Sequence, residues 1–458
     1  MSMNEVNARA ETSSQESVTS IVERLKREGV ELVRLSYCDM HGTARGKDVP
    51  LETLGHVVQE GVAFCVANLI DGLASNPTNA PGLAPDRGYP DMRARPVLST
   101  LVSIPWEPGT AWCIADIANA GAFTEIAPRN LLKRVLARYH HLGLTPVIGP
   151  ELEFFLLRID EAGRPVRYID HHSMVYTVGQ RSDPQGVVRE MLKAARSMGL
   201  QATAANHEFC RGQFEINMLH GEALDAADRT FRFKAMVKEI AAQHGLLATF
   251  MGKPFNDDGG SGFHIHLSIS SEEQANIFAA ANEGETLSLP ARRFLAGIIE
   301  HAPALMAFLA PTINSYKRLV PDSLVPIAAN WAFDNRTSFI RVPAERGKAT
   351  RLEVRAADAA ANPYLAIAAC LVAGLDGMQR ELEPPPPVSG DVSVGEPTGT
   401  LLPRSLEAGL DALRADERLC EGIGRSLVEA FCAMKRVEVE RYRAYITDWE
   451  QNEYLWHL

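Results

Sequence analysis

Six side chains that can ligate metal ions recur inside apolar, strand-like stretches of this 458-residue sequence. They are five glutamates and one histidine, namely Glu151, Glu153, Glu208, Glu215, Glu353 and His264. Residues two apart in a strand point to the same face, so the carboxylates of Glu151 and Glu153 should point the same way. The pairs His264–His266 and Glu353–Arg355 repeat this spacing.

The chemistry of this set depends on whether its members converge. Each pair taken alone is typical of a strand with one solvated face. Gathered on one buried face without cations, the carboxylates would carry a large desolvation cost. Carboxylates with one imidazole suit Mg²⁺ or Mn²⁺, whereas a cysteine set would suit zinc. Five carboxylates and one imidazole suffice for two metals, and two metals with arginines nearby are typical of phosphoryl transfer.

The sequence offers no ready-made phosphate loop. It contains neither GxxxxGK[ST] nor GxGxxG after a strand, and the glycine-rich DDGGSG leads into a strand and is more often a turn. A nucleotide site would therefore be built from strand side chains.

Hydrophobic periodicity predicts that amphipathic helices alternate with the strands that carry these residues. We expect a hairpin over 30–50 that turns at His41–Gly42 and a buried helix at 364–375. A surface loop is expected at 381–402, because that segment is rich in proline and glycine. The other predicted helices are 18–29, 130–143, 186–199, 224–245, 289–309 and 426–450, and the strands are 145–160, 212–219, 260–270, 336–344 and 349–358.

Composition narrows the class of protein. The chain is 46% hydrophobic and 22% charged, with a net charge of −11, which disfavours a nucleic-acid-binding or anionic-membrane surface. Its 7 cysteines form no CxxC pair, so we expect reduced thiols. The N-terminus has no apolar signal core, and no apolar run approaches the length of a membrane span. We expect a cytoplasmic protein without nucleic-acid or membrane partners.

We predict three segments from changes in composition and in the predicted helices and strands along the chain. Residues 1–17 are expected to form a disordered tail, 18–122 a small α+β domain, and 123–458 a larger domain that carries the glutamates.

Six motifs give the sequence a family resemblance over nearly its whole length, from about residue 18 to the C-terminus. They are PELEFF (150–155), HE-x6-E (207–215), GSGFHIHLS (260–268), NSYKRLVP (314–321), NRTSFIRVP (335–343) and RLEVRAADAAANPYL (351–365). In this combination and order they resemble the glutamine synthetase family in its bacterial class I form.

The resemblance implies a fold and a reaction. The expected fold is α+β, with an N-terminal β-grasp domain followed by a catalytic domain in which helices surround a funnel of antiparallel strands. Members form homo-oligomers of two stacked hexameric rings, a dodecamer, with active sites between neighbouring subunits. ATP phosphorylates the γ-carboxylate of glutamate, and an amine then displaces phosphate from the acyl phosphate.

Positions that match the family motifs imply roles for named residues. Glu153, Glu208 and Glu215 would hold one Mg²⁺ or Mn²⁺ ion, and Glu151, His264 and Glu353 a second, with two or more ions per site. Arg336 and Arg341 match the arginines on the phosphates, Arg355 the one near the transferred group, and Arg318 the one on the α-carboxylate of glutamate. His266 and Ser268 match nucleotide contacts, Lys348 a basic residue near the phosphates, Tyr176 a tyrosine beside the active site, and Asp39 the aspartate that helps bind ammonium.

The chain departs from the family at the loop that handles ammonium. Where the family reads PGYEAP this chain reads PDSLVP, so Leu324 replaces a glutamate and Ser323 a tyrosine. Leucine neither attracts a cation nor accepts a proton. Gly259 replaces an asparagine before Gly260 in the glutamate pocket, one residue is inserted just upstream, and the loop 389–402 lacks the tyrosine that is adenylylated in some class I enzymes.

Retained phosphoryl-transfer residues with an altered amine pocket favour an amine that carries a carbon chain. We interpret the sequence as an ATP- and Mg²⁺-dependent γ-glutamyl–amine ligase in amine use or detoxification, a branch of nitrogen metabolism. The resemblance extends to relatives acting on ethanolamine, methylamine, isopropylamine, anilines, putrescine and longer polyamines. Loss of an acid disfavours a polyamine, so the preferred amine is a small monoamine such as ethanolamine. The alternatives are a γ-glutamylpolyamine synthetase, an ordinary glutamine synthetase using ammonia, and a catalytically silent regulatory homologue.

Overall fold

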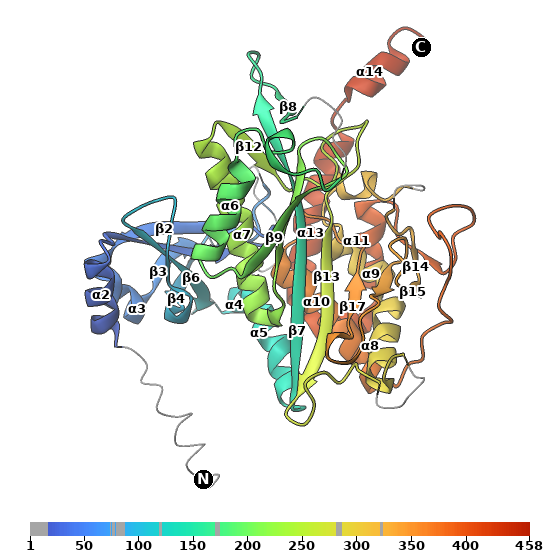
Figure 1. The fold of residues 1–458 in the computed structure, drawn as a ribbon, viewed down its shortest axis with the longest axis horizontal. Coiled ribbons are helices and arrows are strands. Elements are labelled where there is room, and N and C mark those ends of the chain that lie inside the picture. The colour runs from blue at the N-terminus through green and yellow to red at the C-terminus, as the bar shows by residue number, and fades with distance from the viewer. Residues whose placement is uncertain are drawn as a thin grey trace.

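Two β-sheets and the helices around them make up the chain (Figure 1). The computed structural model describes residues 17–73, 75, 78, 88–118, 121–169, 175–280, 286–320 and 324–458, and the structural statements below concern these residues. The predicted tail, apart from residue 17, and the substituted position Ser323 lie outside them.

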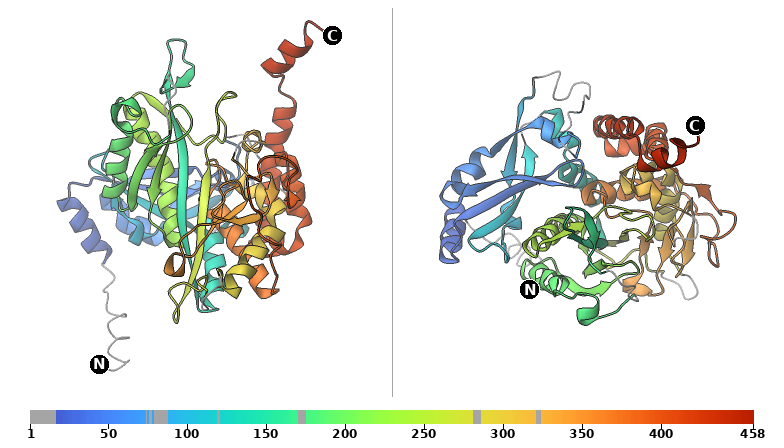
Figure 2. Two further views of the ribbon diagram at one scale, coloured as in Figure 1. Left: turned by 45° about the vertical axis from the view of Figure 1, so that its right-hand side comes forward. Right: turned by 90° about the horizontal axis from the view of Figure 1, so that it is seen from above.

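The smaller sheet comes from the N-terminal part of the chain and has the strand order β2-β1-β6-β4-β3, with β5 paired to β6. Strands β1 and β6 run parallel and the other neighbours antiparallel. The strands are β1 (Leu32–Cys38), β2 (Ala44–Pro50), β3 (Val62–Cys65), β4 (Asp91–Pro96), β5 (Val102–Ser103) and β6 (Thr110–Ala118), accompanied by the helices α2 (Val18–Arg27) and α3 (Leu54–Glu60). In Figure 2 this blue-to-cyan sheet lies to one side of the rest of the chain. The prediction of a β-grasp arrangement and the boundary at 122/123 stay predictions.

The larger sheet is organised around one long strand, β7 (Leu144–Ile159), which pairs with five others. Its order is β15-β16-β17-β13-β7-β10-β9, with β8, β11 and β12 also paired to β7, and every pairing except β15–β16 is antiparallel. The remaining strands are β8 (Pro165–Arg167), β9 (Ala202–His207), β10 (Gln213–Met218), β11 (Gly221–Glu222), β12 (Leu246–Thr249), β13 (Phe263–Ser271), β15 (Trp331–Phe333), β16 (Ile340–Val342) and β17 (Leu352–Val354). The short strands β14 (Ala328–Ala329) and β18 (Thr400–Leu401) form a separate pair.

Helices cover this sheet and share its core. The most buried is α10 (Pro363–Gln379), which is apolar all round, as its sequence predicts. The others are α4 (Ala122–Ile126), α5 (Pro128–His140), α6 (Val187–Ser197), α7 (Ala223–Gln243), α8 (Leu289–Glu300), α9 (Ala302–Leu309), α11 (Leu406–Ala415), α12 (Glu417–Ile423), α13 (Arg425–Arg443) and α14 (Asp448–Tyr454). No helix in the described part of the chain combines the length and the apolar character that crossing a bilayer requires. All seven cysteines are free, as expected.

Two predicted long helices are each broken in the structure. The prediction at 289–309 becomes α8 and α9, because His301 ends the first helix and Pro303 lies in the first turn of the second. The prediction at 426–450 becomes α13 and α14, and α14 starts anew with a capping box at Thr447 and Glu450. In Figure 1 the helix α14 projects away from the body of the molecule. The predicted strand 336–344 shrinks to the three residues of β16.

Candidate active site

The register of β7 brings the predicted carboxylates to one face of the large sheet. Glu151 lies opposite His264 of β13, and Glu153 lies opposite Glu215 of β10. The sequence alone could not decide whether these carboxylates lie together, and the strand pairing shows that they do. Glu208 follows the end of β9, and its backbone N–H donates to the carbonyl of Gln213, closing the turn between β9 and β10.

Glu353 is the deepest of these carboxylates, at 1% exposure. Strand β17 holds it between β13 and β16, opposite His266 on one side and Arg341 on the other. Arg341 donates to Glu353 Oε2 at 2.7 Å, and Arg355 donates to Glu353 Oε1. One buried carboxylate thus orients two of the three arginines for which the family resemblance implies a role in phosphoryl transfer.

Burial and the negative charges of neighbouring glutamates raise the pKa values of Glu208 and Glu215. Burial, followed by the charge of Glu153, raises the pKa of Glu208 to about 7. Burial, with the charges of Glu151, Glu153 and Glu208, raises the pKa of Glu215 to about 9. Raised pKa values in several neighbouring carboxylates indicate that the cluster lacks a compensating positive charge. A divalent cation would supply that charge.

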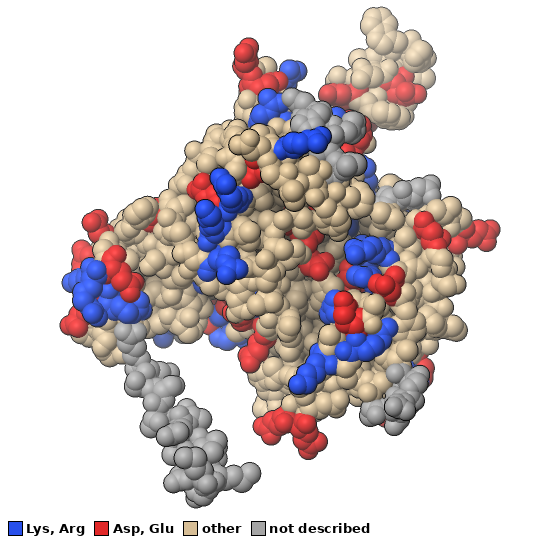
Figure 3. Space-filling model, viewed as in Figure 1, with Lys and Arg blue, Asp and Glu red and all other residues tan. Residues whose placement is uncertain are grey.

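At the other end of the cluster, the imidazoles and arginines lower the pKa values of the carboxylates. Although burial opposes it, hydrogen bonds from His264 and His266 lower the pKa of Glu151. Burial likewise opposes ionisation of Glu353, but the charges of the two histidines and of Arg355 and Arg341 lower its pKa to about 2. On the face shown in Figure 3, acidic and basic side chains gather around a hollow in the region where Figure 1 places β13 and β17.

Three side chains already stand at the spacing of a metal site. Ligand atoms of Glu151, His266 and Glu353 lie within 4.8 Å of one another. His264, which the resemblance implies as the ligand, places Nδ1 at 3.6 Å from Glu151 Oε2 and 4.0 Å from Glu353 Oε1. Carboxylate oxygens with an imidazole nitrogen fit Mg²⁺ or Mn²⁺. The choice between the two histidines, like the role of each predicted ligand, stays a prediction.

Gln213 is a positioning residue that the sequence did not single out. Its Nε2 donates to Glu153 Oε2 at 2.7 Å, and the backbone N–H of Gly262 donates to the same oxygen at 2.7 Å. Both hydrogen bonds go to one oxygen, so among the described residues the other Glu153 oxygen stays available to a ligand such as a metal ion. The only sequence signal was a glutamine two residues before Glu215 on the same strand.

Arg318 lies against two glycines, Gly260 and Gly262, beside the carboxylate cluster. The Arg318 side chain is buried, its Nη1 donates to the carbonyls of Ala356 and Ala357, and its Nε has no partner among the described residues. A Cβ on Gly260 would lie 3.2 Å from Arg318 Cδ and one on Gly262 3.0 Å from Arg318 Nη2. The absence of side chains on Gly260 and Gly262 therefore lets their backbone pack directly against Arg318.

A network of charged residues fixes the loop that carries these glycines, and the sequence analysis missed it. Arg167 and Arg211 both reach Asp257 and Asp258, immediately before Gly259. The backbone N–H of Gly259 donates to Cys210 Sγ at 3.1 Å. The predicted substrate contacts Gly259 and Gly260 thus sit on a loop held from its outer side, next to the inserted residue.

The predicted nucleotide contacts come together at a separate cavity of about 250 Å³. His266, Ser268 and Lys348 line it together with Glu151, so it opens directly beside the carboxylate cluster. Arg351, which the sequence analysis did not assign, also lines it and donates from Nε to His266 Nδ1 at 3.2 Å. The arrangement offers two cations to phosphate oxygens and a polar strand edge to the rest of a nucleotide.

Of the remaining predicted residues, Arg336 and Tyr176 lie beside residues of the carboxylate cluster, and Leu324 is exposed on its loop. Arg336 is exposed, its carbonyl accepts a hydrogen bond from Arg355 Nε at 2.9 Å, and its charge opposes the rise in the pKa of Glu208. Tyr176 is 63% exposed with a φ of 63°, and its N–H donates to the carbonyl of His207, next to Glu208. Leu324 is 46% exposed with a φ of 56°, a backbone conformation that leucine rarely adopts.

Asp39 does not join these residues within one chain. It lies at the end of β1, 1% exposed, and its carboxylate accepts hydrogen bonds from the backbone N–H groups of His41 and Thr43 and from Arg45 Nε. These bonds organise the hairpin turn, and the predicted role of Asp39 in binding ammonium stays a prediction. The half-buried Asp71, in a DG turn after a buried segment, is the more accessible acid beside Arg45, and burial raises its pKa.

Comparison with known proteins places the geometry in a family. Residues 125–454 match the family model described as glutamine synthetase, catalytic domain. The glutamine synthetase of Halobacterium salinarum is 34% identical over 451 residues, covering 95% of this chain and 96% of that protein. The glutamine synthetase of Thermotoga maritima is 34% identical over 450 residues, covering 96% of this chain and 100% of that protein.

Solved structures give the same result for the whole fold. The chain superposes on a structure described as a GmaS/ADP complex with a TM-score of 0.84 and 34% identity, covering 95% of this chain and 99% of that one. A ligand-free GmaS gives 0.83 at 35% identity. A structure described as a novel glutamine synthase homolog gives 0.79 at 26% identity.

Proposed function

The chain belongs to the glutamine synthetase family of ATP-dependent ligases, and from this premise we propose that it joins the γ-carboxylate of glutamate to an organic amine. The favoured amine is a small monoamine such as ethanolamine. The observation that carries the proposal is the combination of a complete carboxylate–arginine cluster with Leu324, an exposed leucine in the loop where the family places a glutamate. The similarity to GmaS, a γ-glutamylmethylamide synthetase, supports ligation of a small amine.

In the first step of the proposed reaction, a γ-carboxylate oxygen of glutamate attacks the γ-phosphorus of ATP, and the bond to the β-phosphate oxygen breaks to release ADP. Arg318, whose buried Nε has no partner among the described residues, would hold the α-carboxylate, and Gly260 would let the backbone pack closely against it. Arg341 and Arg355, both held by Glu353, would meet the charge on the transferred phosphoryl group.

Divalent ions would be held by Glu153, Glu208 and Glu215, and by Glu151, Glu353 and one of His264 or His266. Their chemical contribution there would be to reduce the charge repulsion between the carboxylate nucleophile and the phosphates. The raised pKa values of Glu208 and Glu215 fit this assignment, because a cation would restore the ionised form of both.

In the second step the amine nitrogen attacks the acyl carbon, and phosphate leaves. The amine must first lose a proton, and Leu324 cannot accept it. The Asp39 carboxylate already accepts three hydrogen bonds within its own turn. The more accessible Asp71 or a water molecule is therefore the better acceptor of the amine proton. An amine with a carbon chain would gain apolar contact from Leu324, at about 25 cal/mol per Å² buried.

The competing function is an ordinary glutamine synthetase that uses ammonia. The observation in its favour is that the two relatives at 34% identity both carry that name. Oligomeric assembly is part of either proposal. We expect stacked hexameric rings with active sites shared between neighbouring subunits.

The deciding experiment is a panel of amines. Purified protein with Mg²⁺, ATP and glutamate is assayed for phosphate release with ammonium, ethanolamine, methylamine, putrescine, spermine or aniline. We expect the highest kcat/KM with a small monoamine. A strong preference for ammonium would favour the competing function, and no stimulation by any amine would leave the silent regulatory homologue.

A further inference from the structure

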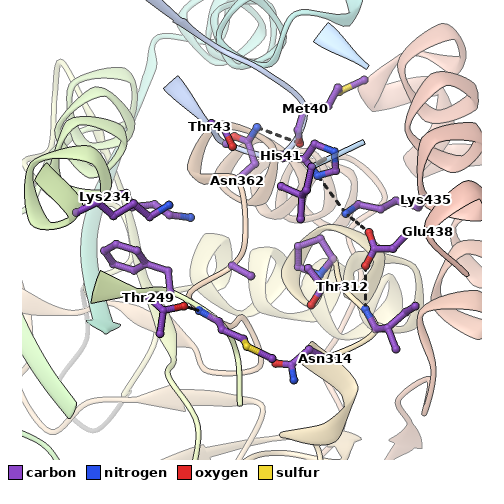
Figure 4. A pocket seen from close by; sticks show the side chains of 18 of the residues that line it. Met40, His41, Thr43, Lys234, Thr249, Thr312, Asn314, Asn362, Lys435 and Glu438 are labelled. Atoms are coloured by element: carbon purple, nitrogen blue, oxygen red, sulfur yellow. Dashed lines mark hydrogen bonds and ion pairs between the residues drawn. The ribbon is translucent and has the colours of Figure 1, made fainter. Parts of the chain in front are cut away.

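A large cavity lies apart from the site described above. It has a volume of about 950 Å³, and none of the described residues that line it belongs to the proposed metal, phosphate or glutamate sites. Its walls come from the β1–β2 turn, α7, residues 246–251 and 311–317, and α13. Figure 4 shows Lys234 on one wall and a row of His41, Lys435 and Glu438 on the opposite wall.

The charge of this cavity is opposite to that of the chain. The described residues that line it include Lys234, Lys238, Lys317, Lys435 and Arg441, but only one acid, Glu438. The chain as a whole carries a net charge of −11. A concave surface with several cations and one acid concentrates anions.

Two of the cations are built into the walls. Lys234 is buried, and its Nζ donates to the carbonyls of Ala359 at 2.9 Å and Ala361 at 3.0 Å, leaving one of its three donor positions. Burial lowers the pKa of Lys234 to about 7, which an anion in the cavity would raise. Lys435 is 1% exposed, and its Nζ donates to Glu438 Oε2 at 3.0 Å.

The rest of the lining is apolar. Phe250, Phe308 and Phe431 line the cavity with Met251 and Leu365, and all but Met251 are buried. Lys238 and Lys317 are exposed, and the ammonium group of Lys317 lies 5.7 Å from the centre of the Tyr442 ring. A ligand that matches this lining has an apolar or aromatic body and a charged group that meets the lysines.

The walls of the cavity continue into the glutamate end of the active site. Asn314 Oδ1 accepts from the N–H of Lys253 at 2.7 Å, and Asn314 Nδ2 donates to the Lys253 carbonyl at 2.9 Å. The adjoining Gly252 carbonyl accepts from Ser261 N–H at 2.9 Å and faces Gly260. On the neighbouring segment 311–317 of this wall, Lys317 directly precedes Arg318.

We propose that this cavity binds a small organic anion with an apolar body and that its occupation changes the affinity of the glutamate site. The second half rests on the proposed function, while the first half does not. Coupling between the two sites is reciprocal, so glutamate would change the affinity of the cavity ligand by the same factor.

The probe for binding is 8-anilinonaphthalene-1-sulfonate, which has an aromatic body and one anionic group. N-phenyl-1-naphthylamine, which has the same body without the charge, is its neutral control. We expect the anionic probe to bind the assembled protein saturably at one site per chain, by fluorescence titration. The double variant Lys238→Gln/Lys317→Gln should weaken it by about tenfold and leave the neutral probe unchanged. The control Lys193→Gln, an exposed lysine of α6, should change neither.

Coupling is measured by calorimetric titration of glutamate with and without saturating anionic probe. A change in glutamate Kd of about fivefold or more that disappears in the double variant would support the proposal. The proposal would be overturned if the double variant lost both probes equally, or if the Lys238 and Lys317 changes did not affect binding of the anionic probe. It would also be overturned if another copy of the chain buried the cavity in the assembled protein. Absence of glutamate binding in every condition would overturn the proposed function and leave the probe result standing.

Discussion

Arg167 of β8 donates from Nε to Asp258 at 2.9 Å, across the 91 residues that separate them in the chain. The side chain of Asp258 is only 12% exposed, and Arg211 approaches it at 3.4 Å from the other side. Asp258 immediately precedes Gly259 and Gly260. The pair therefore holds the glycine loop, which we propose to lie at the glutamate-binding end of the site, from its outer side.

Replacing Asp258 by Asn should loosen this loop. Loss of this carboxylate leaves the two arginines with the more exposed Asp257 as their remaining shared partner, and we expect the KM for glutamate to rise about five- to tenfold. The value of kcat should change less than twofold, because the phosphate arginines are untouched. Steady-state kinetics with glutamate as the varied substrate measure both. Asp411→Asn, which removes an exposed partner of Arg436, is the matched control, and an equal effect in both variants would contradict this positioning role.

Gly260 should tolerate no side chain at all. A Cβ there would lie 2.1 Å from the Gly252 carbonyl oxygen, so Gly260→Ala must displace backbone. We expect glutamate binding to weaken by about tenfold or more and stability to fall by about 1–3 kcal/mol. The contrasting variant is Gly55→Ala, in helix α3, where nothing lies within 4 Å of the added Cβ. It should keep full activity and gain up to about 1 kcal/mol. A Gly260→Ala enzyme with normal glutamate KM would refute the close contact.

Leu324→Glu tests whether this loop selects the amine. A carboxylate at this position would attract ammonium and accept its proton, so we expect the ratio of kcat/KM for ammonium to that for ethanolamine to rise about tenfold or more. The backbone φ of 56° strains glutamate and leucine alike, so folding should not separate them. The control is Leu142→Glu, at an exposed leucine after α5. An unchanged ratio would show that the loop does not choose the nucleophile.

His301 should make stability depend on pH. It is 3% exposed, with Nδ1 at 2.5 Å from Asp416 and Nε2 at 3.0 Å from Asp376. Burial alone would lower its pKa, but these two carboxylates outweigh burial and raise the pKa above its usual value. Its stabilisation is therefore complete below about pH 6.5, the unfolded value, and is lost as pH rises through the higher folded pKa.

Asp376 behaves in the opposite way, since its pKa is lowered by hydrogen bonds from Arg380 and His301 against the effect of burial. Its contribution is present above about pH 4 and fades in acid. Calorimetric Tm values should thus fall from about pH 6.5 to 9, and His301→Gln should flatten that slope. His140→Gln, at an exposed histidine, should preserve it. A wild-type Tm that is level over this range would refute the charged imidazole.

Much of the site could be predicted because its residues carry a local signal. Strand periodicity put Glu151 and Glu153 on one face, and the structure agrees, since β7 is a single 16-residue strand. The opposition of Glu153 to Glu215 depends on which strands pair, and strand register is a long-range property with no mark in either segment.

The parts that failed depend on tertiary contacts. The predicted helix at 289–309 breaks at His301, where the contacts to Asp376 and Asp416 from distant segments accompany the turn. Arg167 and Gln213 were missed because their partners lie 91 and 60 residues away, respectively. The role predicted for Asp39 stays a prediction, and the hydrogen bonds that its carboxylate accepts within the turn could not be read from the sequence.

Glu215→Gln should have opposite effects on stability in the absence and in the presence of metal. Without metal, Glu215 adds a buried carboxylate to the group of Glu151, Glu153 and Glu208, at 8% exposure. Its removal relieves repulsion, so Tm in a chelator should rise. With Mn²⁺ the same change removes a ligand, so the affinity should fall by about tenfold or more and the metal-induced gain in Tm should shrink. Paramagnetic resonance of free Mn²⁺ gives the affinity, and scanning calorimetry gives both Tm values. Glu383→Gln, which removes an exposed partner of Arg292, should move neither quantity. A lower Tm in chelator with an unchanged metal response would mean that Glu215 supports the fold and binds no ion.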